Sequence, residues 1–160
     1  MQKLTPRQLG DAGENHAVAL LEKKGYKAEK LEINAPTYDI RASKSGKDFL
    51  ISVKVARDKQ HVRMGSRRSV LRLEKGNFIF AFIPTEKGCE ITELKPEQYR
   101  LLILPAEFAR EDALSIHDPY WDSKSKDKNG FSVMVKGYGS HHQKMWPNWL
   151  EYTDAWHLLP

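Results

Sequence analysis

A short hairpin places an aspartate and a lysine where their side chains can act together. The stretch TYDIRASKSGKDFLISVKVAR contains two strand-like runs joined by the turn pair Ser45 and Gly46. In a hairpin that is symmetric about this turn, position numbers of facing residues sum to 91, so Asp39 faces Ser52 and shares a sheet face with Lys54. A carboxylate beside an ammonium suits an active site, but Ser52 stands where a second carboxylate would be needed.

A helix before this hairpin has clear start and stop signals. Thr5 is suited to the N-cap, Pro6 to the first helical position, and Gln8 completes a capping box. The helix is expected to end at Lys24, before Gly25. Its apolar side is formed by Leu9, Gly13, Ala17, Leu20 and Leu21.

Glu14 is the polar exception on this helix. It shares an i, i+4, i+7 stripe with Val18 and Leu21, and so borders the apolar side. A carboxylate there faces the body of the protein or its rim. Taken alone, Glu14 is better explained as a helix-surface charge, and an edge-strand charge is a common explanation for a lysine such as Lys54. A solvated residue near a turn is the weaker explanation for Asp39, because a carboxylate between Tyr38 and Ile40 on a central strand is unusual. Their appearance together and in order favours a functional site.

The rest of the chain alternates strand and helix patterns. An apolar run at 77–83, NFIFAFI, predicts a strand that is buried on both faces. Further expected elements are strands at 26–33, 90–94, 99–104 and 131–136, a short helix from Pro105, a loop at 122–130, and a C-terminal helix or turn that packs its tryptophans. This mixture indicates the α/β class.

Length and composition favour one folded domain over residues 1–160. Hydrophobic residues make up 40% of the chain and charged residues 29%. No apolar run approaches the roughly 18 residues that span a bilayer, so no membrane association is expected. The single cysteine, Cys89, excludes an internal disulfide and a multi-cysteine metal site, which suits a cytoplasmic protein. The pair His141 and His142 lacks partners at ligand spacing and is interpreted as a solvated loop.

Positive charge is concentrated in one segment. Residues 57–75 hold seven Arg or Lys and two acidic residues, a net of +5, which equals the net charge of the whole chain. Such a segment suits a surface that binds a polyanion, because phosphate contacts supply much of the affinity for nucleic acids. A solvated loop on a mildly basic protein explains the same charge equally well.

The motifs resemble those of the PD-(D/E)xK nuclease superfamily, and especially its small members related to Holliday junction resolvases. The resemblance rests on GDAGENHAVALLEKKGY, then YDI, then ISVKVAR. It implies a restriction-endonuclease-like core, in which a central mixed β-sheet is flanked by helices. By position, Glu14 matches the helix glutamate, Asp39 the metal-binding aspartate and Lys54 the motif lysine. Ser52 departs from the expected Glu or Gln.

The resemblance implies hydrolysis of phosphodiester bonds with Mg²⁺ or Mn²⁺, because a divalent ion neutralises charge and activates the attacking water. The ligands would be Asp39, Glu14 and the Val53 carbonyl. Lys54 would orient the nucleophile or stabilise developing charge. The hydroxyl of Ser52 is neutral and shorter than Gln, so metal affinity is expected to be reduced.

Three functional hypotheses follow. The first is a metal-dependent endonuclease that acts on double-stranded or branched DNA. The second is a nuclease fold without catalysis that binds DNA, and the third is a subunit that binds a protein partner through its basic segment. The sequence leaves open whether the protein is a homodimer. The candidate nucleic-acid-binding residues are Arg57, Lys59, Arg63, Arg67, Arg68 and Arg72.

Overall fold

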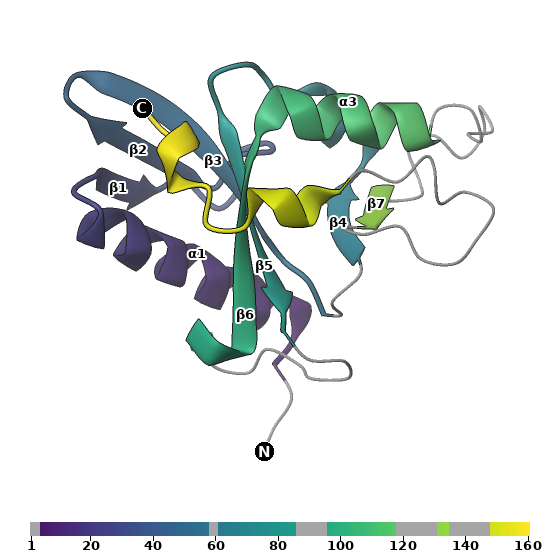
Figure 1. The fold of residues 1–160 in the computed structure, drawn as a ribbon, viewed down its shortest axis with the longest axis horizontal. Coiled ribbons are helices and arrows are strands. Elements are labelled where there is room, and N and C mark those ends of the chain that lie inside the picture. The colour runs from purple at the N-terminus through teal and green to yellow at the C-terminus, as the bar shows by residue number, and fades with distance from the viewer. Residues whose placement is uncertain (1–3, 58–60, 86–95, 118–130, 135–147) are drawn as a thin grey trace.

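The structure, a computed structural model, describes residues 4–57, 61–85, 96–117, 131–134 and 148–160 (Figure 1). Its central sheet has the order β1-β2-β3-β5-β6. Strands β3 and β5 are parallel and the other neighbouring pairs are antiparallel, so the sheet is mixed, as expected. The strands are β1 (Lys27–Lys30), β2 (Ile40–Lys44), β3 (Lys47–Val55), β5 (Phe78–Pro84) and β6 (Tyr99–Pro105).

Helix α1 (Pro6–Lys23) begins and ends where the sequence predicts. The N–H of Gln8 donates to Thr5 Oγ1 (3.2 Å) and the N–H of Thr5 donates to Gln8 Oε1 (2.9 Å), which forms the capping box. Lys24 is the C-cap, and Gly25 follows it with a φ of 87°. The predicted extent of this helix is therefore confirmed to within one residue.

The β2–β3 hairpin has the predicted register. Ser45 and Gly46 have φ values of 52° and 76°, the left-handed pair that a tight hairpin turn requires. Ile40 pairs with Ile51 and Ala42 with Phe49, so the numbers of paired residues do sum to 91. This ladder fixes which side chains of β3 lie on each face.

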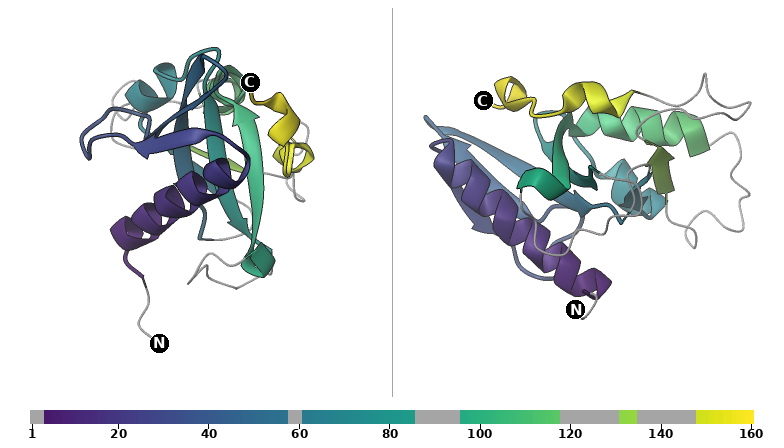
Figure 2. Two further views of the ribbon diagram at one scale, coloured as in Figure 1. Left: turned by 90° about the vertical axis from the view of Figure 1, so that its left-hand side faces the viewer. Right: turned by 60° about the horizontal axis from the view of Figure 1, so that its bottom comes forward.

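The two faces of the central sheet are covered by different elements (Figure 2). Strand β5 is buried on both sides: Phe80 and Phe82 lie in the cluster with α1, and Ile79 and Ala81 lie in the opposite cluster. That second cluster includes helix α3 (Ala106–His117). A strand covered on both faces explains why this sequence is apolar without alternation.

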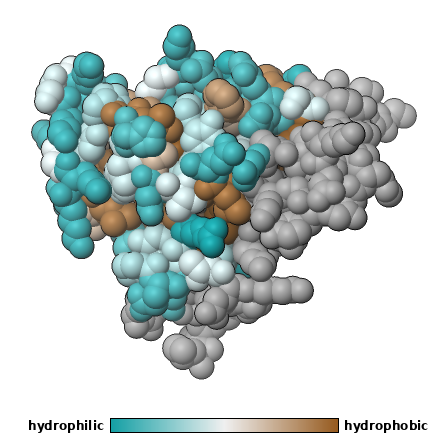
Figure 3. All heavy atoms as spheres, in the orientation of Figure 1, coloured by the Kyte–Doolittle hydropathy of each residue, from teal (hydrophilic) through white to brown (hydrophobic). Residues whose placement is uncertain are grey.

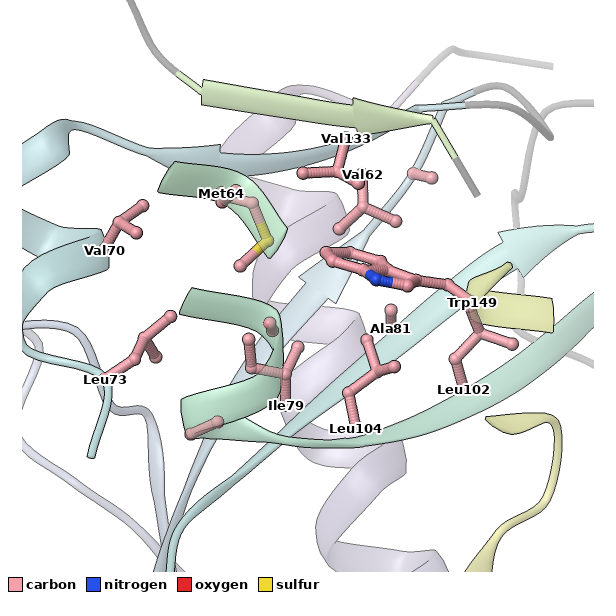
Figure 4. Packing of buried hydrophobic residues seen from close by; sticks show 14 of the residues in the cluster. Val62, Met64, Val70, Leu73, Ile79, Ala81, Leu102, Leu104, Val133 and Trp149 are labelled. Atoms are coloured by element: carbon pink, nitrogen blue, oxygen red, sulfur yellow. The ribbon is translucent and has the colours of Figure 1, made fainter. Parts of the chain in front are cut away.

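A second, two-stranded sheet lies against the α3 side of the molecule. It pairs β4 (His61–Gly65) with β7 (Phe131–Met134), and the short helix α2 (Arg67–Leu71) follows β4. The indole of Trp149, 1% exposed, lies between Val62 of β4 and Ala81 of β5 (Figure 4). Its Nε1–H donates to Asp112 Oδ2 (2.8 Å). Trp149 thus joins the small sheet to the large one.

Three short 3₁₀ helices complete the described structure: η1 (Pro96–Gln98), η4 (Trp149–Tyr152) and η5 (Trp156–Leu158). Trp156 packs edge-to-face on Phe80, so both described C-terminal tryptophans contact the core, as predicted. Hydrophilic residues cover much of the described part of one face, with smaller hydrophobic areas between them (Figure 3). None of the described helices is long and apolar enough to cross a membrane.

Some sequence predictions concern residues outside the described ranges. They include the strand at 90–94, the loop at 122–130, the end of the strand at 131–136, Cys89, Trp146, and the pair His141 and His142.

Candidate active site

Asp39 stands at the end of the β2–β3 ladder and bonds to both neighbours of Ser52. Its N–H donates to the Ile51 carbonyl (2.9 Å), and its Oδ2 accepts from the Val53 N–H (2.7 Å). On the other side, the Asp39 carbonyl accepts from the N–H of Leu31 (2.8 Å). These three bonds fix the backbone of Asp39 and one oxygen of its carboxylate. They hold it beside Ser52, the residue predicted to face it.

The half-buried carboxyl of Asp39 titrates above its usual range. Burial raises its pKa, and the hydrogen bond from Val53 and the positive charges of Lys54 and Lys30 oppose this rise. Because burial is the larger effect, these groups do not fully offset the cost of burying the ionised carboxylate. A site of this kind gains from an added cation.

Lys54 lies close enough to Asp39 for their charges to interact. Burial lowers the pKa of the Lys54 ammonium, and the negative charge of Asp39 opposes that shift. Lys54 is on the β3 face opposite Val53 and Val55, which pack toward α1. The predicted neighbourhood of Asp39 and Lys54 is therefore present in the structure.

Glu14 reaches the same region from α1. Its carboxylate forms an ion pair with Lys30 (3.2 Å), which also lies 3.9 Å from Asp11. Burial raises the pKa of Glu14, the negative charge of Asp39 raises it further, and Lys30 opposes both effects. The carboxylates of Glu14, on α1, and Asp39, directly before β2, are therefore close enough for their negative charges to repel one another.

The packing of α1 on β3 sets the position of Glu14. A Cβ at Gly13 would collide with the side chain of Val55 and would come within 3.4 Å of Val53. Glycine is therefore needed at this position for the helix to lie so close to the strand. The neighbouring Glu14 is consequently held at the rim of the sheet, where its side chain is 23% exposed.

Two pockets adjoin these residues, and Gly10 lines both. The acidic pocket, about 260 Å³, has as its charged lining residues Arg7, Asp11, Glu14, Lys30, Glu32 and Asp39. The basic pocket, about 240 Å³, includes Lys54, Arg57, His61 and Arg63. The structure therefore places the carboxylates of Glu14 and Asp39 in one pocket, and Val53 and the candidate catalytic lysine Lys54 in the other, on either side of Gly10.

Ser52 lines neither pocket. Its side chain is 0% exposed, and within the described residues its Oγ has no hydrogen-bond partner. It points to the same side of β3 as Leu50, which packs against the cluster containing Met64 and Val70. The strand β4 and helix α2 thus contribute to a layer on the face where the second motif carboxylate would lie.

Glu14 and Asp39 are the side chains of this site that remain as candidate metal ligands. The described part of the chain contains no group of three or more His, Cys, Asp or Glu side chains placed to hold a metal ion. Glu14 and Asp39 supply hard oxygen donors that suit Mg²⁺ or Mn²⁺, and such ions retain several waters when protein ligands are few. The donor set fits a divalent ion with two protein carboxylates rather than three.

The candidate DNA-binding residues separate into two groups. Arg57 and Arg63 line the basic pocket, and the Arg57 guanidinium also donates to the Leu4 carbonyl (3.3 Å). Arg67 and Arg68 belong to α2, and Arg72 is its C-cap. Lys59 lies outside the described residues.

Contacts from the start of the hairpin hold α2 in place. Thr37 Oγ1 donates to the Ser69 carbonyl (3.2 Å), and the Tyr38 hydroxyl donates to the Arg72 carbonyl (3.2 Å). Thr37 has a φ of 70°, a left-handed conformation that a β-branched residue rarely adopts. The segment that carries Asp39 is thus tied directly to the basic helix α2.

Sequence reasoning missed Lys30 and Tyr38. Lys30 lies in a short, exposed strand and meets Glu14 only because β1 packs beside α1. Tyr38 has no role predicted from the sequence, but its hydroxyl also accepts from the N–H of Glu74 (2.9 Å). Neither residue has a local spacing signal, because its partners come from other elements.

Comparisons with known proteins place the fold. No family model matches the chain, and no curated protein matches it in sequence. Among solved structures, it is similar to a bacterial homing endonuclease, I-Ssp6803I, with 17% identity and a TM-score of 0.57 over 98% of this chain and 91% of that one. It also matches the Holliday junction resolvase Hjc of Archaeoglobus fulgidus, with 14% identity and a TM-score of 0.47 over 78% and 83% of the two chains.

The fold is therefore restriction-endonuclease-like: a central mixed sheet flanked by helices. This confirms the fold that the motif resemblance implied. At 17% identity the likeness shows the fold, and the roles of Glu14, Asp39, Ser52 and Lys54 stay predictions.

Proposed function

We propose that the protein is a metal-dependent endonuclease that hydrolyses phosphodiester bonds in double-stranded or branched DNA. One observation carries this proposal: Glu14 on α1, Asp39 directly before β2 and Lys54 on β3 come together, and the charge of Asp39 acts on both of the others. A carboxylate pair with an adjacent ammonium, set in a nuclease-type fold, matches the needs of phosphodiester hydrolysis.

Each residue has a distinct role in this proposal. Glu14 and Asp39, with the Val53 carbonyl, would hold Mg²⁺ or Mn²⁺, which when bound neutralises phosphate charge and lowers the pKa of a water. The Val53 N–H holds Asp39 Oδ2, so the carboxylate is oriented before any ligand arrives. Lys54 orients the attacking water or stabilises charge on the phosphate.

Cleavage of plasmid and branched DNA with Mg²⁺ or Mn²⁺ tests the proposal. We expect Asp39→Asn and Lys54→Met each to lower the cleavage rate by about 10²–10³-fold, the usual effect of removing one such group. Matched controls are Asp48→Asn and Lys47→Met, which change exposed residues at the turn end of the same hairpin. Equal rates for all four variants and the wild type would exclude this site.

A second candidate function is DNA binding without catalysis. It is favoured by the complete burial of Ser52 and by the absence, in the described ranges, of any group of three His, Cys, Asp or Glu side chains placed to hold a metal ion. This alternative predicts salt-dependent DNA binding in the same preparation and no cleavage with either metal. The two candidate functions therefore differ in the cleavage assay and agree in the binding assay.

A further inference from the structure

Gly10 occupies a helical position that the fold alone does not explain. It lies inside α1 (Pro6–Lys23), where glycine is less stable than alanine because it loses more backbone freedom on folding. Its φ is not among the positive values, so no left-handed conformation requires it. The backbone conformation therefore does not explain why glycine, which destabilises a helix, stands at position 10.

Packing gives no reason either. A Cβ at Gly10 would meet no heavy atom within 4 Å, whereas a Cβ at Gly13, three residues later, would collide with Val55. The two helical glycines thus differ in kind. Gly13 allows α1 to approach β3, and Gly10 leaves open space beside the helix.

The open space at Gly10 lies between the two pockets. On one side are Asp11, Glu14 and Asp39 of the acidic pocket, and on the other are Lys54 and Arg57 of the basic pocket. Gly10 is the residue that lines both. A side chain here would stand between the candidate metal ligands and the nearby cations.

We propose that one DNA strand crosses α1 at Gly10, so that its sugar-phosphate backbone runs from the basic pocket into the acidic pocket. This inference rests on the proposed function and extends it by naming the path of the substrate. A phosphate in the basic pocket meets Arg57 and Arg63, while the adjacent phosphate lies at Glu14 and Asp39, with Lys54 between the two positions. Glycine permits the close approach of a ligand to the helix backbone.

The inference predicts that substitutions at Gly10 affect thermal stability and DNA affinity differently. Gly10→Ala removes the helix penalty, so the Tm is expected to rise by about 2–4 °C. Gly10→Leu fills the space between the pockets, so its affinity for a fluorescent DNA duplex is expected to fall at least tenfold while the protein stays folded. Affinity is measured by fluorescence anisotropy at one fixed salt concentration, once with EDTA and once with Ca²⁺.

Two control variants separate these effects. Ala19→Leu introduces the same leucine side chain at an exposed position of α1 that lines neither pocket, and is expected to leave DNA affinity unchanged. Gly13→Ala is expected to lower the Tm, because its Cβ collides with Val55.

The outcomes distinguish this inference from the proposed function. If the wild type binds DNA and Gly10→Leu binds equally well, the crossing at Gly10 is wrong and the proposed function stands. A fall in Tm for Gly10→Ala would show a packing role and would also overturn the inference. If the wild type binds no DNA, the proposed function fails together with the inference.

Discussion

The hydroxyl of Ser52 is a polar group sealed inside the protein, and this affects both stability and chemistry. Its side chain is 0% exposed, and no described residue accepts from or donates to it. A buried polar group without a partner costs about 1–3 kcal/mol. The same burial means that a longer carboxylate at this position would have to displace part of the layer above it.

Ser52→Ala is therefore expected to raise the free energy of unfolding by about 1 kcal/mol, because it removes the unsatisfied hydroxyl and keeps the packing. Urea denaturation at neutral pH measures the change. Ser43→Ala, on the paired strand and only half-buried, should stay within about 0.5 kcal/mol of the wild type. A clear loss of stability in Ser52→Ala would mean that the hydroxyl is hydrogen-bonded in solution.

Asp39 makes stability depend on pH. Burial raises its folded-state pKa above the unfolded value of 3.8, so between these two values the folded protein holds its proton more tightly. The carboxyl therefore favours folding at low pH, and this contribution is lost as pH rises through the folded pKa.

We expect Asp39→Asn, measured with a chelator present, to gain stability relative to the wild type as pH rises from about 4 toward neutral. Asparagine has no charge to desolvate and can still accept from the Val53 N–H. Urea unfolding at several pH values checks this, with exposed Asp48→Asn as the control. A gap that narrows with rising pH would contradict the sign of the Asp39 shift.

At the scale of elements, the structure confirms those predictions that depend on neighbours in sequence. The turn at Ser45 and Gly46 sets the register of the hairpin, and the capping box at Thr5 sets the start of α1. Sequence reasoning assigned no helix or strand to the basic segment 57–75, in which the structure has β4 and α2. It also missed the burial of Ser52, because that depends on how segments far apart in sequence pack together.

Tyr38 joins the candidate site to the C-cap of α2 and the segment that follows it through three hydrogen bonds. Its hydroxyl donates to the Arg72 carbonyl and accepts from the Glu74 N–H and the Asn77 amide (3.2 Å). Tyr38→Phe leaves these partners without the hydroxyl and is expected to lower the free energy of unfolding by about 1–3 kcal/mol.

The matched control for Tyr38→Phe is Tyr26→Phe. The Tyr26 hydroxyl makes one described bond, to the carbonyl of the terminal Pro160 (2.7 Å), and should cost about 1 kcal/mol or less. Chemical denaturation compares the two variants. Equal losses would show that the link between the hairpin and α2 contributes little to stability.

At the scale of the whole molecule, charge is divided between the site and its surroundings. The acidic pocket gathers four carboxylates, and the segment 57–75 carries a net charge of +5. An acidic centre flanked by cations suits a metal-assisted reaction on a polyanion, because the cations hold the substrate that the bare carboxylates would repel. The wild-type DNA affinity should therefore fall steeply with salt.

The salt dependence also tests which surface contacts DNA. Arg68 and Arg72 are exposed on and directly after α2, and removing both as the double Ala variant is expected to lessen the slope of log K against log salt by about 2, roughly one for each lost phosphate contact. The matched control removes the same charge elsewhere, with Lys27→Ala and Lys47→Ala at the turn end of the sheet. Because net charge changes equally in both double variants, a slope reduced to the same extent in each would exclude α2 as the DNA contact and leave only a general effect of charge.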